Sequence, residues 1–69
     1  MNEKILEQIK YCRKEKGMTL KELSEKTGLS VGYLSHLENG ERNNPSLDTL
    51  IKICNALNMD ISLLFTREL

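Results

Sequence analysis

The chain has 69 residues, of which 39% are hydrophobic, and its ten basic residues balance its ten acidic residues. This length suits one small domain, spanning residues 1–69, with a single core and no deep catalytic cleft. The longest apolar stretch, ISLLF at 61–65, is far shorter than the roughly 20 residues that cross a membrane, and no charged-then-apolar leader opens the chain. We therefore expect a mostly helical, cytoplasmic protein with no membrane partner.

The first helix is indicated by apolar residues at helical spacing, namely Ile5, Leu6, Ile9 and Cys12. This pattern predicts a helix over about residues 2–16, with Gly17 as its stop.

A second helix is predicted to begin after Thr19, because Thr19 and Glu22 have the spacing of a capping box. Leu20, Leu23 and Thr27 would point inward from this helix, and Gly28 would end it.

A third helix follows almost at once. Ser30 is well suited to cap it, Leu34 and Leu37 would point inward, and Asn39-Gly40 would end it.

The last third of the chain carries the broadest apolar pattern. After a polar loop, a proline stands close to the start of a fourth helix, whose predicted inward face consists of Leu47, Leu50, Ile51, Ile53, Cys54 and Leu57. Asn58 is the expected stop. A fifth, short helix is predicted from Asp60, as its cap, through Phe65.

The residues that carry most enzyme and metal chemistry are scarce. Cys12 and Cys54 are the only cysteines and have no metal-ligand spacing, so we expect reduced core residues. His36 is the only histidine, which excludes a zinc site and leaves little for nucleophilic catalysis. We expect no enzyme activity, no metal and no cofactor.

The stretch from Leu20 to Leu37 has the spacing of a helix-turn-helix. Such a motif needs a small residue near the end of its first helix, a glycine in the turn and apolar residues on the second helix, and Ser24, Gly28, Leu34 and Leu37 meet these needs in order. With the pieces RKEKGMTLKELSEKTGLS, YLSHLENGE and NPSLDTLIKICNALNMDISLLF, the chain resembles the Cro/CI-type helix-turn-helix repressor family of bacteria and their mobile elements over about residues 4–65.

The resemblance implies an all-α fold, a compact five-helix bundle of the lambda-repressor-like DNA-binding type. Its helix-turn-helix would cover about residues 19–39. The second helix of the motif, about residues 30–39, would be the recognition helix that enters the major groove of double-stranded DNA. The implied function is that of a sequence-specific transcriptional regulator, a repressor that binds a pseudo-palindromic operator as a homodimer.

The expected base contacts lie on the recognition helix. Leu34 and Leu37 define its buried side, which places Gly32, Ser35 and His36 opposite. By motif position, Val31, Gly32 and His36 match the family's base readers. A valine can touch a thymine methyl group, Ser35 and His36 can form hydrogen bonds to bases, and Gly32 offers only close approach. If the surrounding motif were absent, the simpler interpretation would be preferred. His36 would be an ordinary exposed histidine, Gly32 a slightly destabilising helix residue and Tyr33 a residue packed at the edge of the core.

Contacts to the DNA backbone would supply most of the affinity. The candidates are Thr19, Leu20, Lys21, Ser30, Tyr33, Asn39, Arg42, Asn43 and Asn44. Leu20 stands where the family often has a glutamine that grips a phosphate, although a branch of the family has leucine there.

Two further contacts are implied by the resemblance or by the apolar pattern. Arg13 and Glu38 match positions that form an ion pair in relatives. The C-terminal residues Ile61, Leu63 and Phe65 are candidates for a dimer interface, and closing the core is nearly as good an interpretation of them.

The rival hypothesis is a helical protein-interaction module or antitoxin in which DNA binding is secondary or absent. The few hydrogen-bonding groups on the recognition helix favour it.

Overall fold

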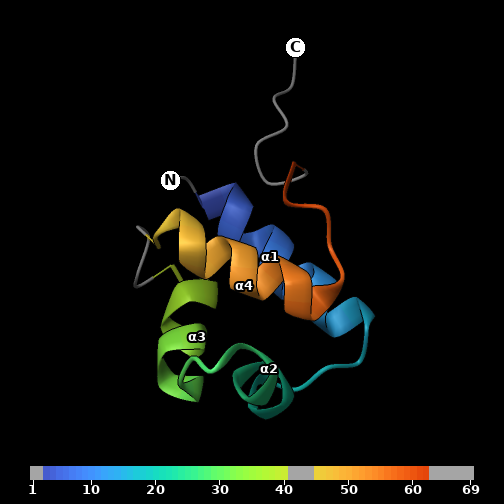
Figure 1. Cartoon of the computed structure of the whole chain (residues 1–69), viewed down its shortest axis with the longest axis vertical. Coiled ribbons are helices and arrows are strands. Elements are labelled where there is room, and N and C mark those ends of the chain that lie inside the picture. The colour runs from blue at the N-terminus through green and yellow to red at the C-terminus, as the bar shows by residue number, and fades with distance from the viewer. Residues whose placement is uncertain (1–2, 41–44, 63–69) are drawn as a thin grey trace.

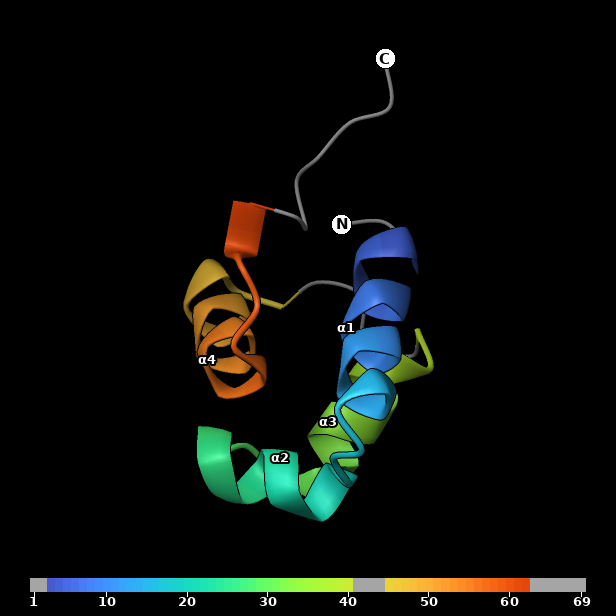
Figure 2. The same cartoon turned by 90° about the vertical axis from the view of Figure 1, so that its right-hand side faces the viewer.

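The computed structural model describes residues 3–40 and 45–62, and within them it contains four α-helices and no strand. The helices are α1 (Glu3–Glu15), α2 (Leu20–Thr27), α3 (Val31–Glu38) and α4 (Leu47–Leu57). Figures 1 and 2 show α2 and α3 side by side at the end of the molecule opposite the first turn of α1, with α1 and α4 above them. The all-α fold predicted from the sequence is confirmed.

The helix count predicted from the sequence was wrong for the described residues, which hold four α-helices where five were expected. After α4 the backbone passes through Met59 and Asp60, and Ile61 and Ser62 then form a tight 3₁₀ turn. Asp60 does act as a cap, since its Oδ1 accepts a hydrogen bond of 2.9 Å from the Ser62 N–H. The remainder of the predicted fifth helix, from Leu63 to Phe65, lies outside the described residues.

The predicted caps of α2 and α3 are in place, and α4 has a cap that was not predicted. The Thr19 side chain accepts a hydrogen bond from the Glu22 N–H, and the Ser30 side chain accepts one from the Tyr33 N–H. Ser46 caps α4 in the same way, and α4 ends at Asn58, which adopts the left-handed conformation with φ 54°. These side chains satisfy backbone donors that a helix leaves without partners at its first turn.

The core lies between α4 and the other three helices. Its fully buried hydrophobic residues are Ile9, Leu23, Leu34, Leu37, Leu50, Ile53, Cys54 and Leu57, of which α4 supplies four. Cys12 is half-buried against this cluster, and both cysteines are free thiols. Burial raises the pKa of the Cys54 thiol above its ordinary value, as is typical of a cysteine that packs as a small hydrophobe.

Two predicted core positions were wrong. The side chains of Leu47 and Ile51 are 59% and 40% exposed. They lie one turn apart on α4, on the flank of the stripe formed by Leu50, Cys54 and Leu57. The six apolar residues of α4 therefore cover more of its circumference than α1, α2 and α3 can bury.

Candidate nucleic-acid interface

The turn that joins α2 to α3 is held by a glycine and by a threonine side chain. Gly28 has φ 79°, a conformation that glycine adopts without the steric penalty of a Cβ, and its N–H donates to the Ser24 carbonyl at 2.8 Å. The Thr27 hydroxyl donates to the Leu23 carbonyl at 2.8 Å and accepts from the Leu29 N–H at 3.1 Å. These bonds link the last turn of α2 to the segment that leads into α3.

The turn ends in Ser30, whose Oγ lies 3.0 Å from the Tyr33 nitrogen that donates to it. Leu34 and Leu37 are then buried in the core, 1% and 2% exposed. With one side of α3 fixed in this way, its opposite side faces away from the protein.

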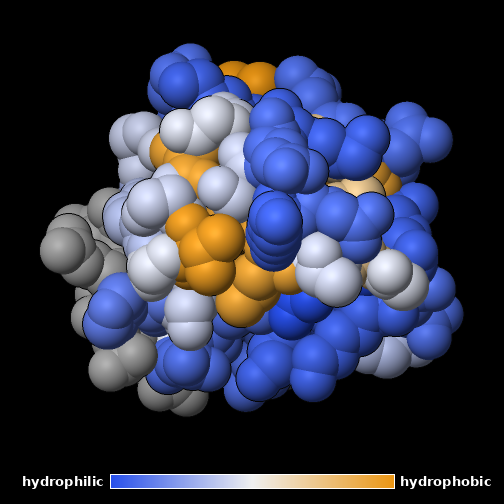
Figure 3. All heavy atoms as spheres, turned by 90° about the horizontal axis from the view of Figure 1, so that it is seen from below, coloured by the Kyte–Doolittle hydropathy of each residue, from blue (hydrophilic) through white to orange (hydrophobic). Residues whose placement is uncertain are grey.

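The outward side of α3 carries the residues that the sequence predicts to contact bases. Val31, Gly32 and His36 are exposed, and Ser35 is half-buried. The Asn39 side-chain amide lies 3.5 Å from the Ser35 hydroxyl. Figure 3 views the molecule from the α2–α3 end and shows a patch of apolar side chains, bordered by weakly polar residues on one side and strongly hydrophilic residues on the other. The four predicted base readers therefore share one accessible stretch of helix.

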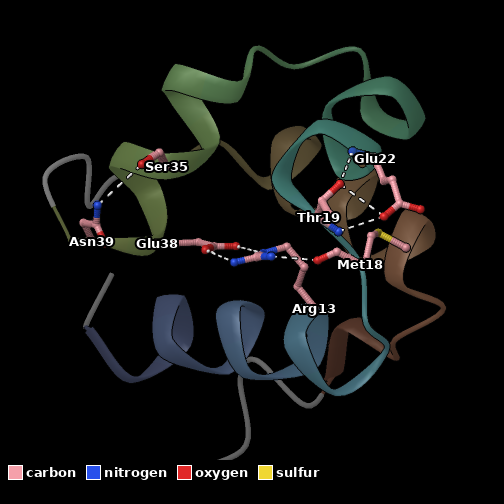
Figure 4. Close-up of polar contacts among 7 residues, drawn as sticks. All are labelled: Arg13, Met18, Thr19, Glu22, Ser35, Glu38 and Asn39. Carbon is pink, nitrogen blue, oxygen red and sulfur yellow. Dashed lines mark hydrogen bonds and ion pairs between the residues drawn. The ribbon is translucent and has the colours of Figure 1, made fainter.

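The N-terminus of α2 is closed by a complete capping box (Figure 4). The Glu22 N–H donates to Thr19 Oγ1 at 3.1 Å, and the Thr19 N–H donates to Glu22 Oε1 at 3.0 Å. The same Oε1 lies 3.1 Å from the Thr19 hydroxyl. These hydrogen bonds to its ionised form hold the pKa of Glu22 below its ordinary value.

An arginine of α1 binds the end of α3 and the loop that leads into α2. The Arg13 Nε–H donates to Glu38 Oε2 at 2.7 Å, and Nη2 donates to Oε1 of the same carboxylate at 2.9 Å. Its third contact runs from Nη1 to the Met18 carbonyl at 2.7 Å, directly before the cap of α2 (Figure 4). The ion pair predicted from the resemblance is thus present, and it joins the end of α3 to α1.

The predicted backbone-contact residues differ in accessibility. Thr19, Lys21, Ser30 and Asn39 are exposed. Leu20 and Tyr33 are half-buried and pack against the core. Arg42, Asn43 and Asn44 lie outside the described residues.

Of the three predicted dimer-interface residues, the structure describes one. Ile61 is half-buried and packs against the core cluster. Leu63 and Phe65 lie outside the described residues.

Within residues 3–40 and 45–62, no group of three or more His, Cys, Asp or Glu residues is arranged to hold a metal ion. None of the helices in this part of the chain is long and apolar enough to cross a membrane.

Sequence reasoning missed two groups that position α3, the Thr27 hydroxyl and the Met18 carbonyl. The Thr27 hydroxyl could have been predicted, because a threonine directly before the turn glycine often bonds to the nearby backbone. The second is a backbone acceptor and has no sequence signature.

Residues 9–64 match the helix-turn-helix family. The chain belongs to this family. Among helix-turn-helix relatives, the transcriptional regulator SinR of Bacillus subtilis (strain 168) is 41% identical over 62 residues, which cover 90% of this chain and 56% of SinR. The immunity repressor protein of Bacillus phage phi105 is 40% identical over 62 residues, covering 90% of this chain and 42% of the repressor. The chain thus spans about half the length of these curated relatives.

Solved helix-turn-helix structures show the same fold. The N-terminal DNA-binding domain of SinR from Bacillus subtilis superimposes with a TM-score of 0.86 at 37% identity, covering 97% of both chains. A crystal structure of SinR, the master regulator for biofilm formation, in complex with DNA gives a TM-score of 0.84 at 40% identity, covering 90% of this chain and 98% of that one.

Proposed function

We propose that the chain is a sequence-specific DNA-binding transcriptional regulator, a repressor that occupies its operator in the cytoplasm and performs no catalysis. The observation that carries this proposal is the accessible outer side of α3, fixed through Leu34, Leu37 and the Arg13–Glu38 pair. The family supports it, because SinR has been crystallised in complex with DNA and a relative is a phage immunity repressor.

In this proposal α3 enters the major groove and its outer side reads bases. Val31, Gly32, Ser35 and His36 face the base edges, and hydrogen bonds from His36 and Ser35 supply the polar part of the readout. Thr19, Lys21, Ser30 and Asn39 are exposed around the motif and contact the phosphates on either side of the groove. Leu20, Tyr33, Arg42, Asn43 and Asn44 complete the proposed backbone contacts.

The absence of net charge does not argue against DNA binding. The first 26 residues hold seven lysines and arginines against five acids, and this segment contains α2, the helix that would cross the DNA backbone. Phosphate contacts made by a few of these residues supply affinity without sequence information.

We further propose that two copies bind a pseudo-palindromic operator, with recognition helices about 34 Å apart. The proposed dimer interface contains Ile61, Leu63 and Phe65. Light scattering of the free chain and of the chain with operator DNA measures the assembly, and a monomer in both samples at high concentration would contradict the dimer.

Selection of binding sites from random duplex DNA tests the function directly. We expect a defined motif and an affinity that falls steeply as the salt concentration rises, because phosphate contacts release counterions. His36→Ala should relax preference at one position of each half-site and weaken binding by about 1–3 kcal/mol. Lys21→Ala is the matched control, and it should weaken all sequences alike.

The rival hypothesis, a protein-interaction module without DNA binding, predicts the opposite result. Such a module would shift no duplex DNA even at low salt. An unchanged selected motif for His36→Ala, in a chain that does bind DNA, would show that the base reader has been misassigned.

A further inference from the structure

The first turn of α3 exposes an apolar side chain where the helix would face DNA. Val31 is 42% exposed, and within the described residues it is the only large hydrophobic side chain of α2 or α3 that is exposed. The Ser30 hydroxyl, directly before it, accepts the capping bond from the Tyr33 N–H. Tyr33 itself is half-buried against the core.

Gly32 leaves an open space beside Val31 that the fold does not require. Its backbone is not in the left-handed region, and a Cβ added at this position would have no neighbour within 4 Å. Glycine inside a helix destabilises it relative to alanine. The fold gains nothing in return, so the bare backbone at Gly32 points to a requirement of the bound partner.

A partner group that packs against Val31 favourably is itself apolar. Among the base edges in the major groove, the 5-methyl group of thymine is the apolar feature, and the other distinguishing features are hydrogen-bond donors and acceptors. A methyl group can pack against the Val31 side chain and approach the backbone at Gly32.

We propose that Val31 and the open space at Gly32 form a contact site for the 5-methyl group of a thymine, so that this turn of α3 reads thymine by its methyl group. The inference rests on the proposed DNA-binding function and deepens it by naming the base chemistry that one turn recognises. It assigns hydrogen-bond readout to the following turn, where Ser35 and His36 lie.

The experiment replaces each thymine of the selected DNA site, one at a time, with deoxyuridine, which removes only the methyl group. With the unaltered chain, one replacement in each half-site should weaken binding about fourfold, the effect of one buried methyl group. Val31→Ala should weaken binding to the thymine site and abolish the further loss caused by deoxyuridine. The matched control, Ile51→Ala, changes a side chain of similar exposure on α4 and should keep the fourfold difference.

Gly32→Ala provides a reciprocal test. The added methyl group occupies the space of the thymine methyl, so the variant should bind the thymine site more weakly, and deoxyuridine should restore part of the lost affinity. The variant's unfolding midpoint should be equal to or above that of the unaltered chain, because alanine favours the helix.

The outcomes separate this inference from the function on which it rests. A chain that binds no duplex overturns both. A chain that selects a defined site, but whose affinity is unchanged by every deoxyuridine replacement, overturns the thymine contact alone. The same holds if Val31→Ala keeps the full sensitivity to deoxyuridine.

Discussion

The guanidinium group of Arg13 and the carboxylate of Glu38 meet in a two-bond ion pair between α1 and the end of α3, with donor–acceptor distances of 2.7 and 2.9 Å. Both side chains are almost completely buried, 10% and 4% exposed. The hydrogen bond to Glu38 raises the pKa of Arg13 above its ordinary value. Because Arg13 also donates to the Met18 carbonyl, the same side chain holds the end of α3 and the loop before α2.

Removal of one member of this pair should destabilise the fold strongly. Arg13→Met leaves the Glu38 carboxylate buried without its partner, and we expect the free energy of unfolding to fall by about 3–5 kcal/mol. Urea denaturation followed by circular dichroism measures the change. The double variant Arg13→Met, Glu38→Leu should lose less than the single variant, because no charge is then left buried. A loss below about 1 kcal/mol for Arg13→Met would mean that the pair behaves like an exposed one.

The capping box predicts an acid-sensitive contribution to stability. The pKa of Glu22 is lowered in the folded chain by its hydrogen bonds to the backbone and side chain of Thr19. The stabilisation is therefore fully present above the glutamate's ordinary pKa and is lost as the pH falls through the lower value of the folded state. The midpoint of urea unfolding, measured from pH 7 to pH 3, should fall more steeply for the unaltered chain than for Glu22→Gln. Parallel curves for the two proteins would contradict this prediction.

The caps could be predicted from the sequence because their signals are local. Thr19 and Glu22 are three residues apart, as are Ser30 and the Tyr33 N–H that it accepts from, so backbone geometry alone brings them together. The same holds for the buried side of α3, which follows from Leu34 and Leu37 once the helix is known. The outward position of Gly32 and His36 then follows, whereas Val31 was included among the base readers by its motif position.

The predictions of burial that were wrong concern residues whose burial depends on the neighbouring helices. Leu47 and Ile51 satisfy the apolar period of α4 as well as Leu50 does, and only the arrangement of α1 and α2 around α4 decides which of them is covered. The contact from Arg13 to the Met18 carbonyl depends on the path of the backbone after α1, which no side-chain pattern encodes. Local sequence patterns therefore predict where the helices lie. Which residues at the edge of each helix's apolar face are buried depends on tertiary packing.

The two faces of α4 should respond very differently to the same substitution. Leu50 is fully buried, and Leu50→Ala should reduce the free energy of unfolding by about 2–5 kcal/mol through lost burial and the cavity left behind. Leu47→Ala removes the same atoms from a side chain that is 59% exposed, and its cost should be about 1 kcal/mol or less. Thermal and urea unfolding of the two variants provide the comparison. Equal costs would show that Leu47 is covered in solution.

The turn of the helix-turn-helix should depend on the hydroxyl group of Thr27. Thr27→Val keeps the shape of the side chain but removes the acceptor of the Leu29 N–H and the donor to the Leu23 carbonyl. We expect a loss of about 1–3 kcal/mol, since the partly buried Leu29 N–H is left without its acceptor. Thr27→Ser keeps the hydroxyl and should retain most of the stability. Amide hydrogen exchange at Leu29 reports the bond itself, so exchange should be faster in Thr27→Val and close to normal in Thr27→Ser. If the Leu29 amide exchanges at the same rate in all three proteins, the hydroxyl does not hold the turn, and α3 owes its position to Gly28 and to the packing of Leu34 and Leu37.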